Sequence, residues 1–206
     1  MNEEIKESKQ LLRKKIRQLL NQQNDEFLRK ASPEILDNLL KLPAWAEADI
    51  ILAYLPMKDE VNTIPFIEAA LASGKKAAVP RIDGDDIIFH FIDSLSPASF
   101  EKHEYGMPEP PASSPVFDTA SINEKNVLIL VPGLAFDQSC RRLGRGKSFY
   151  DRFLSACMHL SAGSQRFIKA GISFHLQIAD AVPVEEHDVI LDYVITEKAV
   201  YSSLKR

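Results

Sequence analysis

Apolar residues recur at helical spacing in two segments near the start of the chain. In residues 3–21, Ile5, Leu12, Ile16 and Leu19 fall along one side, which predicts an amphipathic helix. A second helix is expected over residues 24–42, where Pro43 ends it. Its expected buried positions are Phe27, Ile35, Leu36, Leu39 and Leu40.

The pattern then changes to short apolar runs separated by helical segments. Residues 49–55 predict a strand, and a helix capped by Asn62 or Thr63 follows and ends at Ala72, before Gly74. Residues 75–81 predict a second strand, ended by a proline. Strand, helix and strand at this spacing predict a parallel pair joined by a crossover helix.

The rest of the chain continues this alternation. A turn at residues 83–85 leads to an expected edge strand or hairpin arm at 87–92, and residues 94–126 are expected to form a long functional loop. Further strands are expected at 127–131, 166–172 and 192–196. We therefore expect one domain over residues 1–206, a three-layer α/β/α fold with a central, mostly parallel sheet.

Composition narrows the functional class. The chain has 206 residues, is 45% hydrophobic and 26% charged, and carries a formal net charge of -4, which argues against a dedicated nucleic-acid binder. No apolar run is long enough for a membrane span, and the first residues lack a secretory h-region. The two cysteines form no disulfide framework. We expect a cytoplasmic monomer that binds neither nucleic acid nor membrane.

The segment 127–154 concentrates candidate chemistry. A buried strand ends at Pro132, and a loop with two glycines follows, carrying the cations Arg141, Arg142, Arg145 and Lys147. Aromatic and apolar residues then recur at helical spacing, so a helix is expected to begin near Lys147. Backbone N–H groups at a helix start, together with nearby cations, favour an anion such as phosphate.

Two common phosphate motifs do not match this loop. A P-loop needs glycine at the position of Arg141, and the dinucleotide fingerprint needs glycine at the position of Phe149. Taken alone, the loop could also be a surface turn with solvated basic side chains. The five histidines show no metal-ligand spacing, and no G-x-S-x-G elbow occurs.

The complete segment, PGLAFD followed by RLGRGK, an aromatic pair and Asp151, closely resembles the signature of the 5-formyltetrahydrofolate cyclo-ligase family. The resemblance extends to residues 9–13, 55–60, 107–110 and 182–188. Two residues depart from it. Cys140 and Ser148 stand where the family usually has glycine, so either would be strained if its position requires a positive φ.

The resemblance implies an ATP- and Mg²⁺-dependent enzyme that closes 5-formyltetrahydrofolate, with or without a polyglutamate tail, to 5,10-methenyltetrahydrofolate. It implies a scaffold related to sugar-phosphate isomerase and CoA-transferase-like folds. Arg145 and Lys147 are the implied catalytic cations, and Asp151 and Asp188 the implied metal ligands. The implied ATP contacts are Lys9, Arg13, Arg142, Leu143, Gly144, Arg145, Gly146, Lys147, Ser148, Phe149 and Tyr150. The implied substrate contacts are Leu55, Glu60, Tyr105, Arg145, Lys147 and Phe149.

Simpler interpretations of the same residues stay open. Lys9 and Arg13 lie on one helical face and could be a solvated basic stripe, and Lys147 with Asp151 could be a surface salt bridge. Alternative functions are a cofactor-free sugar-phosphate isomerase or acyl transferase with Glu60 as base, and a non-catalytic nucleotide- or folate-binding module. Cys157 is expected in the core, whereas Cys140 could be reactive. RNA binding is a weaker alternative.

Overall fold

The computed structural model describes residues 3–102, 108–118, 125–160, 167–186 and 188–204. Its centre is a seven-stranded sheet in the order β11-β10-β9-β6-β1-β2-β3. The strands from β10 to β2 run parallel, and the two edge strands, β11 and β3, are antiparallel to their neighbours. The strands are β1 (Ile50–Leu52), β2 (Lys76–Asp83), β3 (Asp86–Ile92), β6 (Val127–Val131), β9 (Phe167–Ile172), β10 (Tyr193–Ile195) and β11 (Val200–Ser202).

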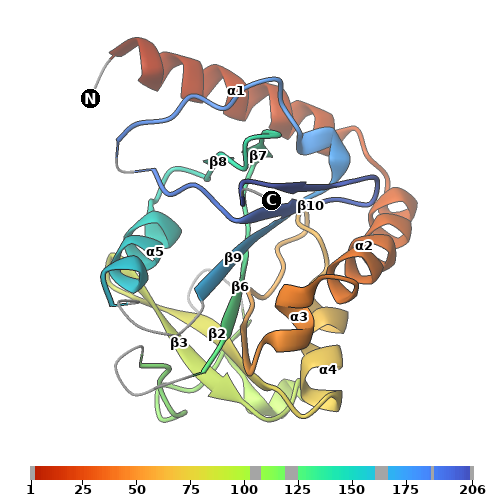
Figure 1. Cartoon of the computed structure of the whole chain (residues 1–206), viewed down its shortest axis with the longest axis vertical. Coiled ribbons are helices and arrows are strands. Elements are labelled where there is room, and N and C mark those ends of the chain that lie inside the picture. The colour runs from red at the N-terminus through yellow and green to blue at the C-terminus, as the bar shows by residue number, and fades with distance from the viewer. Residues whose placement is uncertain (1–2, 103–107, 119–124, 161–166, 187, 205–206) are drawn as a thin grey trace.

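Helices cover both faces of this sheet. Figure 1 shows α2 (Asp25–Leu40), α3 (Pro43–Glu47) and α4 (Ile64–Ala72) on one face, and α5 (Phe149–Leu160) on the other. Successive strand residues point to opposite faces. Ile51 and Leu128 accordingly join the core beneath α2–α4, whereas Ile50 and Ile129 join the core that contains Leu154 of α5. The predicted three-layer α/β/α architecture is confirmed.

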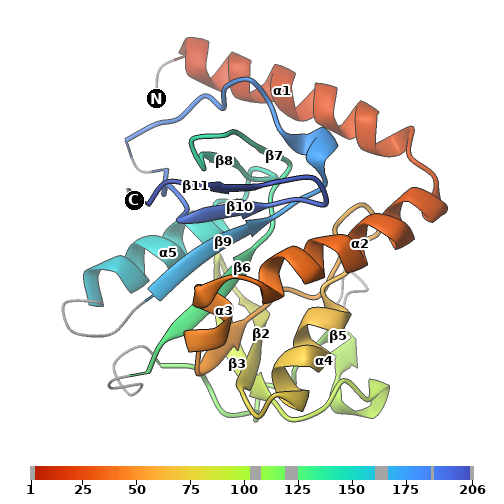
Figure 2. The ribbon, with the colours of Figure 1, turned by 45° about the vertical axis from the view of Figure 1, so that its right-hand side comes forward.

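Helix α1 (Glu3–Asn21) lies at one end of the sheet, as Figure 2 shows. It contacts η2 (His175–Gln177) and β7 (Ala135–Phe136), the segments that follow the carboxyl ends of β9 and β6. Ile16 is buried, as the amphipathic pattern predicts, while Ile5, Leu12 and Leu19 are partly buried. Leu20 and the Lys9 side chain are buried as well. The helix therefore covers the carboxyl ends of these parallel strands, which is where such folds place ligands.

Two prolines act differently from the sequence prediction. Pro43 does not only end α2, because it is also the first residue of α3. Pro80 does not end β2, which continues to Asp83. The N–H of Ile82, two residues along the strand, donates to Glu109 and not to β3, so position 80 also faces away from β3. Proline there removes no bond of the ladder.

Several short elements were not predicted. They include the antiparallel pair β7 and β8 (Arg142–Leu143), strand β11, η2, and, within the expected long loop, η1 (Pro97–Ser99), β4 (Glu101–Lys102) and β5 (Pro108–Glu109). Elements of two or three residues are too short to show periodicity. Across the residues that the structure describes, no helix is long and apolar enough to cross a membrane.

Candidate active site

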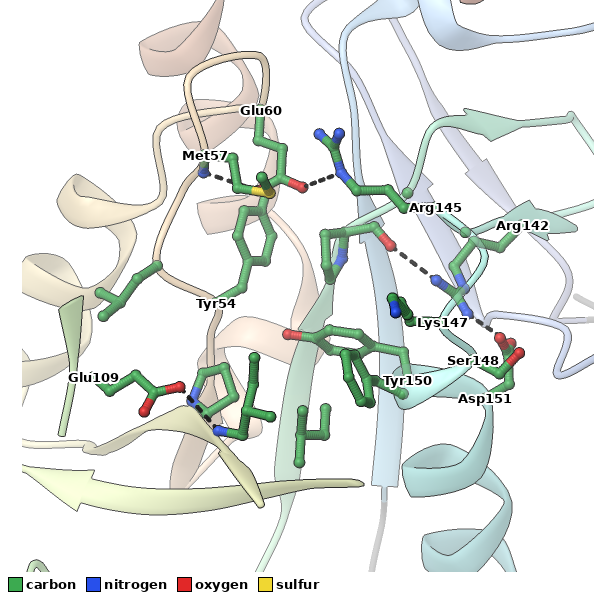
Figure 3. A pocket seen from close by; sticks show the side chains of 18 of the residues that line it. Tyr54, Met57, Glu60, Glu109, Arg142, Arg145, Lys147, Ser148, Tyr150 and Asp151 are labelled. Carbon is green, nitrogen blue, oxygen red and sulfur yellow. Dashed lines mark hydrogen bonds and ion pairs between the residues drawn. The ribbon is translucent and has the colours of Figure 1, made fainter. Parts of the chain in front are cut away.

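A cavity of about 290 Å³ lies beyond the carboxyl ends of β1, β2 and β6 (Figure 3). Within the sheet, β2 lies next to β1 on one side and β6 lies next to β1 on the other. The chain passes from β1 to β2, and later from β6 outward in the opposite direction to β9 and β10. Such a reversal of strand order opens a crevice between the two diverging connections. The lining residues are Tyr54, Leu55, Met57, Glu60, Pro80, Ile82, Ile87, Pro108, Glu109, Pro132, Gly133, Arg142, Gly144, Arg145, Lys147, Ser148, Phe149, Tyr150 and Asp151.

The loop after β1 supplies the acidic wall of the cavity. The Glu60 side chain is only 9% exposed, and its Oε2 accepts a hydrogen bond from the Met57 backbone N at 3.0 Å. Burial raises the pKa of Glu60, although the Met57 N–H and Arg145 act to lower it. Leu55 lines the same wall. The sequence prediction that Leu55 and Glu60 lie in the site is consistent with this geometry.

Arg145 crosses from the glycine-containing loop to these acids. Its Nε donates to Glu60 Oε1 at 3.1 Å, and its Nη2 donates to Asp59 Oδ1 at 2.7 Å. Burial acts to lower the pKa of Arg145, but the hydrogen bonds and charges of Asp59 and Glu60 raise it overall. The guanidinium is therefore already neutralised by two protein carboxylates. Asp59 was not singled out from the sequence, because spacing alone does not reveal a partner so far along the chain.

A buried carboxylate organises the start of the glycine-containing loop. Asp137 Oδ1 accepts hydrogen bonds from the backbone N of Ser139 and Arg141, and its Oδ2 accepts one from Val182 N. The Asp137 residue is 2% exposed. It therefore joins the loop to the segment leading to Asp188. Asp137 is the last residue of the PGLAFD motif, but its hydrogen bonds to the loop and to Val182 could be found only from the structure.

Arg142 and Asp151 lie together at one side of the cavity, on the right in Figure 3. Arg142 Nη2 donates to Asp151 Oδ1 at 2.6 Å, and its Nη1 donates to the Pro132 carbonyl oxygen at 3.1 Å. The simpler expectation of a surface salt bridge between Lys147 and Asp151 is therefore wrong. The buried guanidinium of Arg142, brought close by β8, takes the carboxylate instead.

Lys147 is the cation with a different environment. It precedes α5, its residue is exposed, and its side chain lines the cavity. Within the described part of the chain, its ammonium makes no ion pair, whereas Lys9, Arg142 and Arg145 each hold protein carboxylates. A positive charge at a helix start, without a carboxylate partner, is suited to an anionic ligand.

Tyr150 contributes a polar atom that has no partner. Its hydroxyl is buried and makes no hydrogen bond among the described residues, and its ring lines the cavity beneath Arg142. Burial raises the pKa of Tyr150, so the hydroxyl stays protonated and is a donor. Phe149 also lines the cavity, while Leu143 is buried in the core and does not line the cavity.

Both residues that replace family glycines adopt the backbone conformation that favours glycine. Cys140 has φ 60° and Ser148 has φ 56°, and the intervening Gly146 has φ 112°. The loop thus keeps its shape at a local cost of roughly 1–2 kcal/mol for each non-glycine residue. Cys140 is fully buried, and burial raises its pKa to about 11, so the suggestion that it is reactive is not supported. Cys157 is buried in the core, as expected.

Ser148→Gly is expected to stabilise the protein by up to about 1 kcal/mol, because relief of the positive φ exceeds the extra chain entropy of glycine. Ser148 is exposed, so little packing is lost. Cys140→Gly is the matched comparison, and its gain is expected to be smaller because a buried side chain is removed. Urea denaturation measures both variants. A Ser148→Gly protein less stable than the parent would contradict this explanation.

Helix α1 holds the outer side of the loop. Arg13 Nε donates to the Gly144 carbonyl oxygen at 3.0 Å, and Lys9 Nζ contacts Glu185 Oε2 and Asp188 Oδ2, each at 2.7 Å. Burial acts to lower the pKa of Lys9, but these hydrogen bonds raise it overall. The alternative that Lys9 and Arg13 form a solvated basic stripe is therefore wrong. Lys9 and Arg13 lie beside the loop, and neither they nor Gly146 of the loop line the cavity.

The two expected metal ligands each hold a protein cation, Asp151 with Arg142 and Asp188 with Lys9. Burial lowers the pKa of Arg13, while the charges of Asp188 and Asp151 act to raise it, so both carboxylates lie within electrostatic reach of that guanidinium. The described part of the chain contains no group of three or more His, Cys, Asp or Glu side chains that could hold a metal ion. Tyr105, the remaining expected contact, lies outside the described residues.

The hairpin β2–β3 and strand β5 add cavity residues that were not predicted. Pro80, Ile82 and Ile87 supply apolar surface, and Glu109 Oε1 accepts the Ile82 N–H at 3.0 Å. These residues look like ordinary hairpin positions in the sequence. Residues 107–110 belong to the part of the chain that resembles the family, but the resemblance assigned no role to Glu109.

Comparison with known proteins identifies the family. The sequence profile of the 5-formyltetrahydrofolate cyclo-ligase family matches residues 5–197, nearly the whole chain. The chain belongs to the 5-formyltetrahydrofolate cyclo-ligase family. This membership agrees with the resemblance carried by the PGLAFD and RLGRGK motifs.

Individual relatives agree with this membership. A 5-formyltetrahydrofolate cyclo-ligase of Mycolicibacterium smegmatis is 34% identical over 151 residues, covering 72% of this chain and 73% of the relative. One from Escherichia coli (strain K12) is 26% identical and covers 93% and 99%. The solved structure of 5,10-methenyltetrahydrofolate synthetase from Aquifex aeolicus matches with a TM-score of 0.78 at 27% identity, covering 96% of this chain and 94% of the other. Family membership and these neighbours support cyclo-ligase activity.

Proposed function

We propose that this protein uses Mg-ATP to convert 5-formyltetrahydrofolate to 5,10-methenyltetrahydrofolate, releasing ADP and phosphate, in the cavity between the loop after β1 and the start of α5. The observation that carries the proposal is Lys147, the cavity cation without a carboxylate partner among the described residues. Opposite it stands the buried carboxylate of Glu60. The Lys147 end of the cavity suits the phosphates of ATP, and the Glu60 end suits the pterin of the folate.

The acidic wall suits the pterin. The amino-pyrimidinone edge of a pterin presents adjacent N–H donors, and Glu60 offers a carboxylate to accept them. Leu55, Ile82 and Ile87 provide apolar surface for a flat ring system. In this orientation the pterin enters the crevice at the strand ends, with its formyl group directed toward the basic loop.

The chemistry requires activation of a weak electrophile. The N5-formyl group is an amide, and its oxygen is a poor leaving group. In the proposed first step, the formyl oxygen attacks the γ-phosphorus, a new O–P bond forms, and the bond from phosphorus to ADP breaks. N10 then adds to the activated carbon and loses its proton to water or phosphate. Cleavage of the C–O bond releases phosphate and leaves the methenyl cation.

The residues of the chain contribute alignment and charge neutralisation. Lys147 would stabilise the negative charge on the transferring phosphoryl group, and Arg145 would remain near the formyl oxygen. The unpartnered Tyr150 hydroxyl is a further donor at the same wall. No general base is needed for the first step, because the tertiary N5 amide has no proton to lose.

Magnesium is compatible with the donor set, but only together with the nucleotide. Asp151 and Asp188 are hard oxygen ligands near Arg13, and Mg²⁺ usually combines one or two carboxylates with phosphates and water. Asp151 and Asp188 would hold the ion, which would supply further charge neutralisation on the phosphates. Arg142 and Lys9 would fix these carboxylates in place beforehand.

The isomerase and acyl-transferase alternatives fit less well. They require Glu60 as a free base, and its two carboxylate oxygens are engaged by Arg145 and the Met57 N–H. The non-catalytic alternative is suggested by Cys140 and Ser148, which replace the glycines usual in the family. Both residues adopt the positive φ values, and the cations of the loop keep their places around the cavity.

An absorbance assay for methenyltetrahydrofolate tests the proposal. With 5-formyltetrahydrofolate, ATP and Mg²⁺ together, we expect product to accumulate together with ADP. We expect none when ATP is omitted or replaced by ADP, and a strong reduction when EDTA removes the metal. Product formation without nucleotide, or folate binding without any product, would contradict the proposed reaction.

Glu60→Gln is expected to raise the KM for 5-formyltetrahydrofolate by about tenfold or more, because a charge-assisted acceptor for pterin N–H groups is weakened. Binding of ATP to the free enzyme should change little. In the parent enzyme, kcat/KM for the folate should fall on the acid side as Glu60 is protonated, at a pH above the ordinary glutamate pKa because burial raises it. The variant should lose this acid limb. An unchanged limb, or a selective loss of ATP affinity, would move Glu60 to another role.

A further inference from the structure

The loop after β1 presents two adjacent carboxylates to one guanidinium. Arg145 Nη2 contacts Asp59 at 2.7 Å, whereas its Nε contacts Glu60 at the longer distance of 3.1 Å. The two acids differ in burial, since the Asp59 side chain is 31% exposed and that of Glu60 only 9%. One arginine therefore has an anchor near solvent and a second anchor inside the cavity.

The inner anchor is the one that a pterin needs. Burial raises the pKa of Glu60, and the charge of Asp59 raises it further. N–H donors from a ligand would therefore stabilise the Glu60 carboxylate. They would compete with Arg145 for Oε1, because Oε2 is held by the Met57 N–H. When the substrate binds, Arg145 Nε is the group that loses its acceptor.

From this geometry we infer that Asp59 is a positioning residue: it retains Arg145 in the cavity when the substrate takes over Glu60, so that the freed Nε is directed at the substrate. This inference rests on the proposed function and deepens it. With Asp59 in place, the guanidinium pivots about its Nη2 contact and keeps its position. Without Asp59, Arg145 has no remaining acceptor among the residues described and can turn to solvent.

A carboxylate placed beside the phosphates of ATP repels them, so the two acids next to Arg145 need an explanation. Asp59 and Glu60 together carry two negative charges against the one positive charge of Arg145. The arrangement is therefore poorly suited to binding phosphate through Arg145 before the folate arrives. It is suited to delivering Arg145 to the formyl oxygen once Glu60 is occupied, while Lys147 holds the phosphates.

Asp59→Asn tests this inference, since it keeps the size of the side chain but replaces the charged acceptor that holds Arg145 with a weaker, neutral one. We expect kcat to fall on the order of 100-fold, the effect of misplacing a catalytic group by about an ångström. We expect the KM for folate and the urea midpoint to change little. Asp59→Glu should recover most of the activity. Asp86→Asn, which breaks the exposed Arg152–Asp86 pair at 2.8 Å, is the matched control and should leave kcat unchanged.

A double-mutant comparison separates positioning from direct action. In an Arg145→Ala background, Asp59→Asn should cause no further loss of kcat. A kcat for Asp59→Asn within about twofold of the parent would overturn the inference, because exposed ion pairs often contribute nothing measurable. A full additional loss in the Arg145→Ala background would also overturn it. A parent protein that forms no methenyl product would instead contradict the proposed function and, with it, this inference.

Discussion

Lys147→Ala is expected to reduce kcat on the order of 1000-fold, because a preorganised positive charge facing the transferring phosphoryl group is removed. Among the cations that line the cavity, neither Arg142 nor Arg145 is free to take its place. Arg142 is held by Asp151, Arg145 by Asp59 and Glu60, and Lys9 by Glu185 and Asp188. The measurement is the rate of methenyl product formation at saturating Mg-ATP and folate.

Two controls define the meaning of this result. Lys147→Arg retains the charge and should keep much more activity than Lys147→Ala, while Lys198→Ala removes an exposed lysine in the turn between β10 and β11 and should have no effect. Unfolding by urea should be unchanged in all three variants, because Lys147 is exposed and makes no ion pair among the described residues. Parent-like turnover in Lys147→Ala would refute its assigned role.

Asp137→Ala is expected to have the largest effect on stability, a loss of at least about 3 kcal/mol. It leaves the backbone N–H groups of Ser139, Arg141 and Val182 without their charged acceptor; the bond from Val182 is buried and the other two are partly buried. Hydrogen bonds to charged groups contribute about 1.5–3 kcal/mol each. Urea denaturation measures the loss. Activity should also fall, because Asp137 joins the glycine-containing loop to the segment with Glu185 and Asp188.

The control for Asp137 is Asp85→Ala, which removes an exposed carboxylate from the turn between β2 and β3. Its stability should stay within about 0.5 kcal/mol of the parent, as for most surface substitutions. If Asp137→Ala were equally well tolerated, the hydrogen bonds of this carboxylate would not organise the loop. The site would then depend on other contacts.

The main elements could be predicted because their signals are local. The amphipathic repeat of residues 3–21, the buried run 127–131 and the glycine-containing loop before a helix all appear in the structure near their expected places. The two unusual residues, Cys140 and Ser148, were also informative. Glycine at such positions indicates a positive φ, and both residues have one.

The pairing of charges could not be predicted, because it depends on which segments the fold brings together. Spacing along a helix placed Lys147 beside Asp151, but strand β8 brings Arg142 to that carboxylate. Likewise, Lys9 reaches the segment near Asp188, and Asp59 reaches Arg145, across long distances in the sequence. Pro80 was misjudged for the same reason, since only the sheet reveals that its missing N–H faces away from β3.

The central claim is that the formyl oxygen of the folate is phosphorylated in the cavity between Glu60 and Lys147. The most direct measurement uses 5-formyltetrahydrofolate labelled with ¹⁸O in the formyl group, with Mg-ATP, and analyses the phosphate released. We predict that the phosphate carries the formyl ¹⁸O, because the C–O bond breaks after the O–P bond has formed. Unlabelled phosphate, released in step with methenyl product, would contradict the account.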